Sequence, residues 1–254
     1  MVTACGVSDI GPARKTNEDS FTADEQLQLL VVADGMGGHL AGEVASSLAV
    51  ETIAGFVRRS SDQDGECSWP YGIDPELSFC SNRLRTAIHL ANRRVFRAAE
   101  KYDEYTGMGT TVVCALISAN RLAVGHAGDS RLYLFADGTL RQLTTDDTWE
   151  ATVLAEQPDT ASATQAHSMR HVLTNVLGAR ETADVHLHEY ELRGGETILL
   201  CSDGLHNVVD DKELCGLVSG DDPLTDIGSR LIAAALSKGG RDNVTVVLAR
   251  YDGN

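Results

Sequence analysis

The sequence is short of positive charge, proline, aromatic residues and long apolar runs. Its 254 residues include 21 Lys and Arg against 37 Asp and Glu, a formal net charge of −16, with 5 Pro and 5% aromatic residues. Few basic residues argue against binding duplex nucleic acid or an anionic membrane surface, since both attract a basic face. The longest apolar runs, such as Leu29–Ala33, are far too short to cross a bilayer. With 43% hydrophobic residues, the composition excludes collagen, coiled coil and wholesale disorder and predicts a globular domain.

Cysteine is present but without the spacing of a zinc site or a disulfide framework. No C-x-x-C pair occurs among the six cysteines, which are Cys5, Cys67, Cys80, Cys114, Cys201 and Cys215. Cys114 and Cys201 lie in apolar runs, where cysteine acts as a small hydrophobic residue. The segment Met1–Asp9 lacks the basic flank and apolar stretch of a signal peptide. We therefore expect reduced, structural cysteines and a cytoplasmic location.

Hydrophobic patterns predict strands and helices in blocks rather than in strict alternation. Apolar periodicity predicts helices over residues 41–58, 82–101, 211–218 and 224–237. Short runs rich in Val, Leu, Ile and Thr predict strands over residues 27–33, 110–117, 121–126, 131–135, 196–201 and 243–250, and Asp137-Gly138 signals a hairpin. This order favours layered, largely antiparallel sheets with helices outside. No linker divides the chain, so we expect one domain over residues 1–254.

Four aspartates lie where a predicted core strand meets a loop. Asp34-Gly35 and Asp203-Gly204 each follow an apolar strand, Asp129 follows another, and Asp242 precedes a fourth. A single Asp-Gly pair is ordinary turn chemistry. If the four strands are neighbours, however, their carboxylates converge, and like charges in one place are costly unless a cation balances them. Mg²⁺ or Mn²⁺ prefers such oxygen ligands, so the pattern favours a metal site over four separate turns.

The histidines do not suggest zinc. His186 and His188 alternate along an expected strand and would share one face, and we expect His126 to form a hydrogen bond within its own strand. His39, His167 and His171 lie in loops or at loop edges, and each is a candidate proton donor.

Six blocks of sequence, in order along the chain, resemble the metal-dependent Ser/Thr protein phosphatases of the 2C class. The first runs from Ser8 to Asp19 and the second from Ala33 to Glu43. The others cover residues 107–111, 128–131, 200–205 and 240–245, so that the resemblance spans nearly the whole chain. The Gly-Met-Gly-Gly-His stretch at residues 35–39 resembles the bacterial branch of the family.

The resemblance implies an α+β fold, a four-layer α-β-β-α sandwich with two central, largely antiparallel sheets and a binuclear metal site at one edge. It implies that Asp34 bridges two Mn²⁺ or Mg²⁺ ions, that the Gly35 carbonyl binds the second, and that Asp203 and Asp242 complete the first. Asp129, with Asp203, would form a weaker third site. Glu18 would hold metal-bound water, and Arg14 would grip the substrate phosphate. Arg suits that role because its planar fork makes bidentate contacts; the alternative is a surface ion pair of Arg14 with Glu18 or Asp19.

The sequence departs from the family pattern at two places. Many eukaryotic members carry a His directly after the Asp-Gly pair as a proposed proton donor, but Met36 stands here, which leaves metal-bound water or another His, such as His39, for that role. The second is the flap, about residues 145–169, where His167-Ser168 replaces the His-Pro of many relatives. Loss of that Pro removes a backbone constraint, so the position of the flap is open.

The resemblance implies a protein phosphatase that hydrolyses phosphoserine and phosphothreonine with a metal-activated water, acting as a monomer on phosphoproteins that a Ser/Thr kinase modifies. One alternative is a phosphatase of the same fold dedicated to a single signalling partner. A second is a catalytically silent binding scaffold, which Asp34, Asp203 and Asp242 disfavour because silent forms normally lose metal ligands. A metal-dependent nuclease would use similar carboxylates, but the charge of −16 disfavours a polyanionic substrate.

Overall fold

Two antiparallel sheets face each other in the centre of the molecule. The computed structural model describes residues 1–38, 40–61, 69–156 and 169–253. The first sheet has the order β1 (Val2–Asp9), β11 (Val244–Tyr251), β10 (Glu196–Cys201), β7 (Arg131–Ala136) and β8 (Thr139–Gln142). The second has the order β2 (Asp19–Asp24), β3 (Leu29–Met36), β5 (Val112–Ser118), β6 (Arg121–Ala127) and β9 (His186–Glu191), with β4 (Gly109–Thr110) paired to the end of β3.

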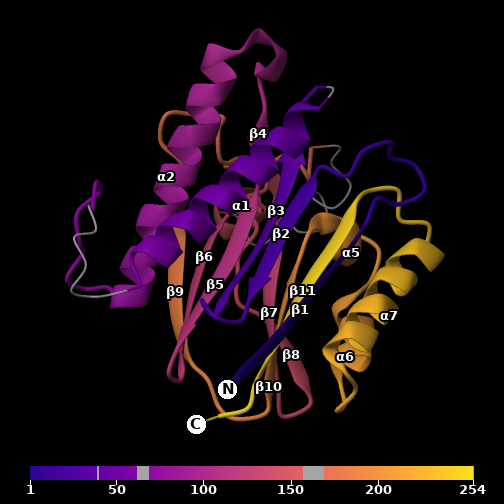
Figure 1. Cartoon of the computed structure of the whole chain (residues 1–254). Helices are drawn as coiled ribbons and strands as arrows, with labels where there is room; N and C mark the ends of the chain where they lie inside the picture. Colours follow the sequence, from indigo (N-terminus) through magenta and orange to yellow (C-terminus); the bar gives the residue numbers. More distant parts are fainter. Residues whose placement is uncertain (39, 62–68, 157–168, 254) are drawn as a thin grey trace.

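Helices cover both outer faces, which completes four layers (Figure 1). α1 (Ala41–Arg59) and α2 (Phe79–Lys101) lie over the second sheet, and α6 (Asp211–Val218) and α7 (Leu224–Ser237) lie over the first. Shorter helical segments are η1 (Asp103–Tyr105), α3 (Trp149–Glu156) and α5 (Asp203–His206). The observed layers confirm the α+β sandwich that the resemblance implied.

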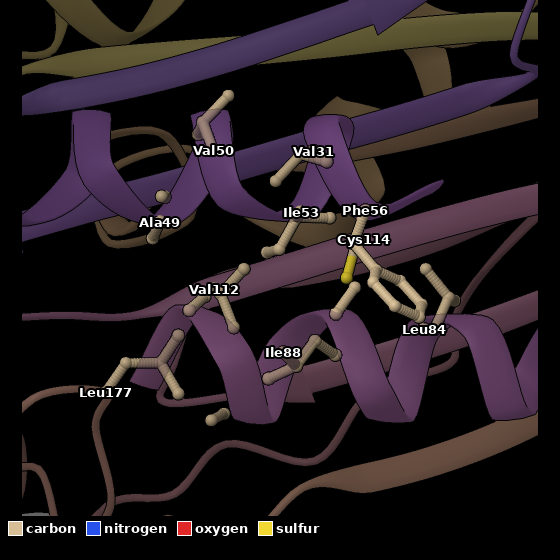
Figure 2. Close-up of a cluster of buried hydrophobic side chains, with 14 of the residues drawn as sticks. Val31, Ala49, Val50, Ile53, Phe56, Leu84, Ile88, Val112, Cys114 and Leu177 are labelled. Carbon is tan, nitrogen blue, oxygen red and sulfur yellow. The ribbon is translucent and has the colours of Figure 1, made fainter. Parts of the chain in front are cut away.

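Three hydrophobic cores lie between the four layers. In β3, Leu29 and Val31 point to α1 and α2, whereas Leu30 and Val32 point to the other sheet. This two-sided burial explains why the central strands are continuous apolar runs rather than alternating ones. Figure 2 shows the first core, in which Ile53 and Phe56 of α1 and Ile88 of α2 meet the sheet. Full burial of each such side chain contributes about 1.5–3 kcal/mol to folding.

The predicted elements agree with the structure to within a few residues, with one division. The expected strand 110–117 is two strands, because Thr110 pairs with Gly35 while β5 begins at Val112 and pairs further along β3. β1, β2, α3 and α5 were not expected. β2 in particular has the polar sequence DSFTAD, and its inward side chains are not apolar enough to give a strand pattern.

The cysteines and the helices can be compared with the sequence expectations wherever the structure describes them. The described cysteines, Cys5, Cys80, Cys114, Cys201 and Cys215, are unbonded thiols. No helix in the described ranges combines the length and apolar character needed to cross a membrane. Cys67, His39, His167 and Ser168 lie outside the described residues, as does the middle of the flap.

Candidate metal and phosphate site

The strand ends bring the predicted site residues to one edge of the sandwich. Asp34 lies near the end of β3, Asp129 follows β6, Asp203 follows β10 and Asp242 precedes β11. β3 and β6 belong to one sheet and β10 and β11 to the other, so the carboxylates converge from two facing sheets rather than from four neighbouring strands. Together with Glu18 they line a single cavity of about 230 Å³. We call these five residues the acidic edge; it lies at the end of the sandwich opposite the chain termini (Figure 1).

Asp34 is held in place by hydrogen bonds of its main chain. Its carbonyl oxygen accepts hydrogen bonds from the Thr111 backbone N–H at 2.8 Å and the Thr110 hydroxyl at 2.9 Å, and its own N–H donates to Thr111 Oγ1 at 3.1 Å. These bonds fix the main chain but leave the carboxylate facing the cavity. Burial, and then the charges of Asp19, Asp203, Asp129 and Asp242, raise the pKa of Asp34 well above its usual value.

Asp203 and Asp129, like Asp34, lie in an environment that disfavours their ionised forms. Burial, followed by the charge of Asp242, raises the pKa of Asp203, and its buried Oδ1 has no hydrogen-bond partner among the described residues. Its Oδ2 accepts from Asn207 Nδ2 at 3.0 Å. Burial and the charge of Asp203 raise the pKa of Asp129 to about 7. An excess of buried, facing carboxylates with an unpartnered oxygen is the electrostatic signature of a cation site.

Asp19 is a further acidic residue that sequence reasoning did not place in the site. It pairs with Asp34 across β2 and β3, and its Oδ2 accepts from the hydroxyls of Thr245 at 2.6 Å and Ser202 at 2.8 Å. Its Oδ1 is buried without a partner, and burial raises the pKa of Asp19 to about 6. Its adjacency to Glu18 in the first sequence block was the available signal. The strand register that turns it toward Asp34 could not be read from the polar β2 sequence.

Glu18 and the Gly35 carbonyl approach each other around Gly42, at the start of α1. A Cβ at Gly42 would lie 2.5 Å from Glu18 Oε1 and 2.9 Å from the Gly35 oxygen, so any larger residue there would fill the space between them. Burial raises the pKa of Glu18, as expected for a carboxyl in an enclosed position. The absence of a side chain at Gly42 therefore keeps two oxygen groups open to the same space.

Arg14 is the cation at the mouth of the cavity. Its Nη2 donates to Asp242 Oδ2 at 2.7 Å, and its Nη1 lies 3.5 Å from Glu18 Oε2. The ion pair with Glu18 that the sequence allowed is therefore present, and the pair with Asp242 adds to it, whereas Asp19 bonds elsewhere. The Arg14 side chain remains 45% exposed, so it can also be reached by a ligand.

On the flap side of the cavity, Asp147, in the segment between β8 and α3, holds neighbouring loops together through hydrogen bonds. Asp147 Oδ2 accepts from the Gly128 N–H at 2.9 Å and from Asn175 Nδ2 at 2.7 Å, and its Oδ1 lies 2.9 Å from His186 Nε2. These bonds tie the turn before Asp129 to the segment after the flap. His126 contacts this region as well: it forms a hydrogen bond with the Thr145 carbonyl at 3.0 Å, so the expectation of a bond within its own strand is wrong. The expected shared face of His186 and His188 is present in β9, where both rings stack on His126.

Of the candidate proton donors, His171 lines the same cavity as Arg14. Met36 lines the same cavity, at the position where many eukaryotic relatives carry His. His39 and His167 lie outside the described residues, so their role as proton donors stays a prediction.

Two facing antiparallel sheets between helical layers, with a carboxylate-lined cavity at one edge, define a class of metal-binding α-β-β-α sandwich. The Protein phosphatase 2C family profile matches residues 13–245. This chain belongs to that family.

The chain is similar to bacterial Ser/Thr protein phosphatases. It is 38% identical over 242 residues to Serine/threonine protein phosphatase PstP of Mycobacterium tuberculosis, covering 95% of this chain and 43% of that protein. It is 32% identical over 244 residues to Serine/threonine phosphatase stp of Listeria welshimeri, covering 95% of this chain and 92% of that protein. It thus spans less than half of the mycobacterial relative. The crystal structure of the PstP catalytic domain with two manganese ions matches with a TM-score of 0.80 and 37% identity, covering 98% of this chain and 97% of that one.

Proposed function

We propose that this chain is a metal-dependent protein Ser/Thr phosphatase that hydrolyses phosphoserine and phosphothreonine. The observation that carries the proposal is the acidic edge: five carboxylates line one cavity in which Arg14 is the only Lys or Arg side chain of the described lining. Such a site repels a phosphate dianion until cations occupy it, and divalent cations supply charge neutralisation and an activated water when bound.

The residues present fit two Mn²⁺ or Mg²⁺ ions. The buried Oδ1 of Asp203 has no hydrogen-bond partner among the described residues, and the space that a side chain at Gly42 would fill lies against the Glu18 carboxylate and the Gly35 carbonyl oxygen. Among the described residues, no three His, Cys, Asp or Glu side chains lie close enough together to hold a metal ion by themselves, so water and the Gly35 carbonyl would have to complete the coordination. In this proposal Asp34, the Gly35 carbonyl, Asp203 and Asp242 would hold the ions, and Asp129 with Asp203 would offer a weaker third site.

The remaining residues bind and orient the substrate. Arg14 would shift from Asp242 toward two phosphate oxygens, which its planar guanidinium can bind together. Glu18 would orient a water through hydrogen bonds. A phosphoprotein, modified by a Ser/Thr kinase, is the proposed substrate, because the exposed cavity admits a side chain that projects from a partner. We also propose that the protein is a monomer and that it is cytoplasmic. The cysteine pattern supports the cytoplasmic location.

The test is phosphate release by the full chain from an aryl phosphate and from phosphothreonine peptides, with Mn²⁺, with Mg²⁺ and with chelator. We expect hydrolysis of both substrates that stops when the divalent ions are removed. Activity that survives complete chelation contradicts the proposal. Hydrolysis of the aryl phosphate but of no phosphopeptide favours the phosphatase dedicated to one signalling partner. Metal binding without any hydrolysis favours the silent scaffold.

A further inference from the structure

Three buried asparagines each organise a loop through the same set of hydrogen bonds. Asn82 and Asn92 lie in α2 and are 1% exposed, and Asn243 precedes β11 and is 3% exposed. Each accepts one backbone N–H with Oδ1 and donates Nδ2 to at least two backbone carbonyls. A planar amide is the side chain that can satisfy one N–H and two C=O groups at once.

Asn243 differs from Asn82 and Asn92 because the loop that it organises contains Arg14. Its Oδ1 accepts from the Glu18 N–H at 2.8 Å, and its Nδ2 donates to the Ile10 carbonyl at 2.9 Å and the Thr16 carbonyl at 3.1 Å. The amide thus joins both ends of the irregular segment between β1 and β2. Arg14 lies in the middle of this segment.

The segment also packs tightly on the main chain beside Asn243. Gly11 has a φ of +72°, and a Cβ there would lie 2.3 Å from the Asp242 carbonyl oxygen. Apart from bonds to Asn243, Gly11 N–H donates to Asp9 Oδ1 at 2.7 Å and Asn17 Nδ2 donates to Ser8 Oγ at 2.8 Å. Ser8 Oγ also bonds Thr245 Oγ1 of β11 at 2.7 Å, and Arg14 itself bonds Asp242. Asn243 is distinct from these contacts because one side chain ties both ends of the segment to the residue next to Asp242.

We infer that Asn243 is a positioning residue that fixes the Arg14 segment, and with it the guanidinium, in the place where it binds phosphate. The inference rests on the proposed function. Without the amide, the Ile10 and Thr16 carbonyls and the Glu18 N–H lose their shared partner, and the segment is free to move away from Asp242. Asn243 does not touch the phosphate; it acts through Arg14.

The test compares Asn243→Ala with Asn92→Ala, a matched truncation of an amide that bonds to Gly178, Arg180 and Glu181 away from the Arg14 segment. Inorganic phosphate is the probe, measured by calorimetry on the full chain with saturating Mn²⁺ and as an inhibitor of aryl phosphate hydrolysis. We expect Asn243→Ala to weaken phosphate binding and raise KM about tenfold while kcat changes less than about threefold, the pattern of lost substrate binding. Asn92→Ala should leave phosphate binding and KM within about twofold, since it lies outside the site.

A double variant shows whether the effect passes through Arg14. In an Arg14→Ala background, Asn243→Ala should weaken phosphate binding by no more than about a further twofold, because the group it positions is gone. Mn²⁺ affinity, measured separately by calorimetry, should be retained in Asn243→Ala. Full additivity with Arg14→Ala, lost Mn²⁺ affinity, or unchanged phosphate binding in folded Asn243→Ala overturns the inference. If Asn243→Ala does not fold, Asn243→Ser, which keeps one polar group, takes its place with the same expectations.

The two proposals fail in different ways. If Arg14→Ala leaves phosphate affinity unchanged, the proposed role of Arg14 is wrong and so is the inference. If Arg14→Ala weakens binding but Asn243→Ala does not, only the inference fails. Because phosphate binding is measured by calorimetry, the comparison can be made even if the wild type hydrolyses neither substrate, an outcome that contradicts the proposed function alone.

Discussion

Two Asp-Gly pairs of the same sheet have opposite environments. Asp203-Gly204 follows β10 and Asp137-Gly138 follows β7, and because these strands are antiparallel neighbours, the pairs lie at opposite ends of the sandwich. Asp203 has a buried oxygen, a raised pKa and carboxylates around it. Asp137 is exposed in the β7–β8 hairpin, with φ of +50° at Asp137 and +74° at Gly138.

The glycines of the two pairs, Gly204 and Gly138, are needed for different reasons. A Cβ at Gly204 would lie 2.0 Å from the Asn243 carbonyl oxygen, so glycine there permits two backbone segments to touch. A Cβ at Gly138 would meet nothing within 4 Å, and glycine is favoured there by its left-handed φ alone. Asp-Gly therefore allows two backbone segments to touch at Gly204, whereas it allows a left-handed turn at Gly138. Only the surroundings of the two pairs distinguish these roles.

The largest difference between the pairs should appear in activity. Asp203→Asn removes a charge that the proposed function assigns to metal binding, and we expect kcat/KM for phosphopeptide hydrolysis to fall by about 10³-fold or more, a loss of at least about 4 kcal/mol in transition-state stabilisation. Asp137→Asn should keep wild-type activity within about twofold, since it touches nothing in the cavity. Steady-state assays in Mn²⁺ check both. Full activity of Asp203→Asn would remove Asp203 from the metal site.

Stability should separate the two glycines. Gly204→Ala forces a methyl group against the Asn243 carbonyl, and we expect it to lower the free energy of unfolding by about 3 kcal/mol or more. Gly138→Ala has room for the methyl group and should cost about 1 kcal/mol, through the left-handed backbone alone. Urea unfolding of the metal-free variants measures both values. Equal losses at the two sites would show that the close contact at Gly204 relaxes.

The pH dependence of stability should distinguish the buried carboxylates from the exposed one. Asp129 has its pKa raised to about 7 in the folded state, so the folded protein binds more protons than the unfolded chain, and this carboxylate destabilises the metal-free fold as the pH rises from 5 to 8. We expect the stability of Asp129→Asn relative to wild type to grow by about 2 kcal/mol over that range.

Subtracting two unfolding curves removes the opposing contribution of His206, whose pKa burial lowers to about 4. Asp137→Asn is the matched control, because it makes the same Asp→Asn change at an exposed position. Saturating Mn²⁺ should abolish the advantage of Asp129→Asn at high pH, because bound cations stabilise the ionised carboxylates. A pH-independent difference for Asp129→Asn would show that Asp129 is solvated rather than buried among charges.

The sequence allowed a large part of this comparison to be predicted. The apolar runs before Asp34 and Asp203 indicate buried strands, and Asp137-Gly138 between two short strands indicates a hairpin, so both assignments follow from local patterns. The central strands and helices follow for the same reason, since burial on both faces gives continuous apolar runs. The order of the four layers required the resemblance, because short strands alone do not specify which sheet each joins.

What could not be predicted depends on pairing between distant segments. Asp19 lies beside Asp34 only through the register of β2 with β3, and Asn243 meets Ile10 only because β1 and β11 are neighbours. The pairs of Arg14 with Asp242 and of His126 with Thr145 likewise join residues far apart in sequence. None of these contacts has a periodic signature, whereas strands and turns do.

The smallest expected effect is that of Asp137→Asn on stability, and this substitution should stabilise the protein rather than impair it. Asparagine tolerates the left-handed conformation at least as well as aspartate, and Asn-Gly is the preferred pair in a two-residue hairpin turn. Asp137→Asn also removes one negative charge from a molecule with a net charge of −16. We therefore expect this substitution to raise the free energy of unfolding by up to about 0.5 kcal/mol. Urea denaturation at pH 7 with and without 1 M salt checks it: a gain that persists in salt comes from the turn, whereas one that disappears comes from charge, and a clear loss would mean that the Asp137 carboxylate stabilises the hairpin. The same Asp→Asn change that inactivates at position 203 should thus stabilise at position 137, because a carboxylate needs a cation in one place and is dispensable in the other.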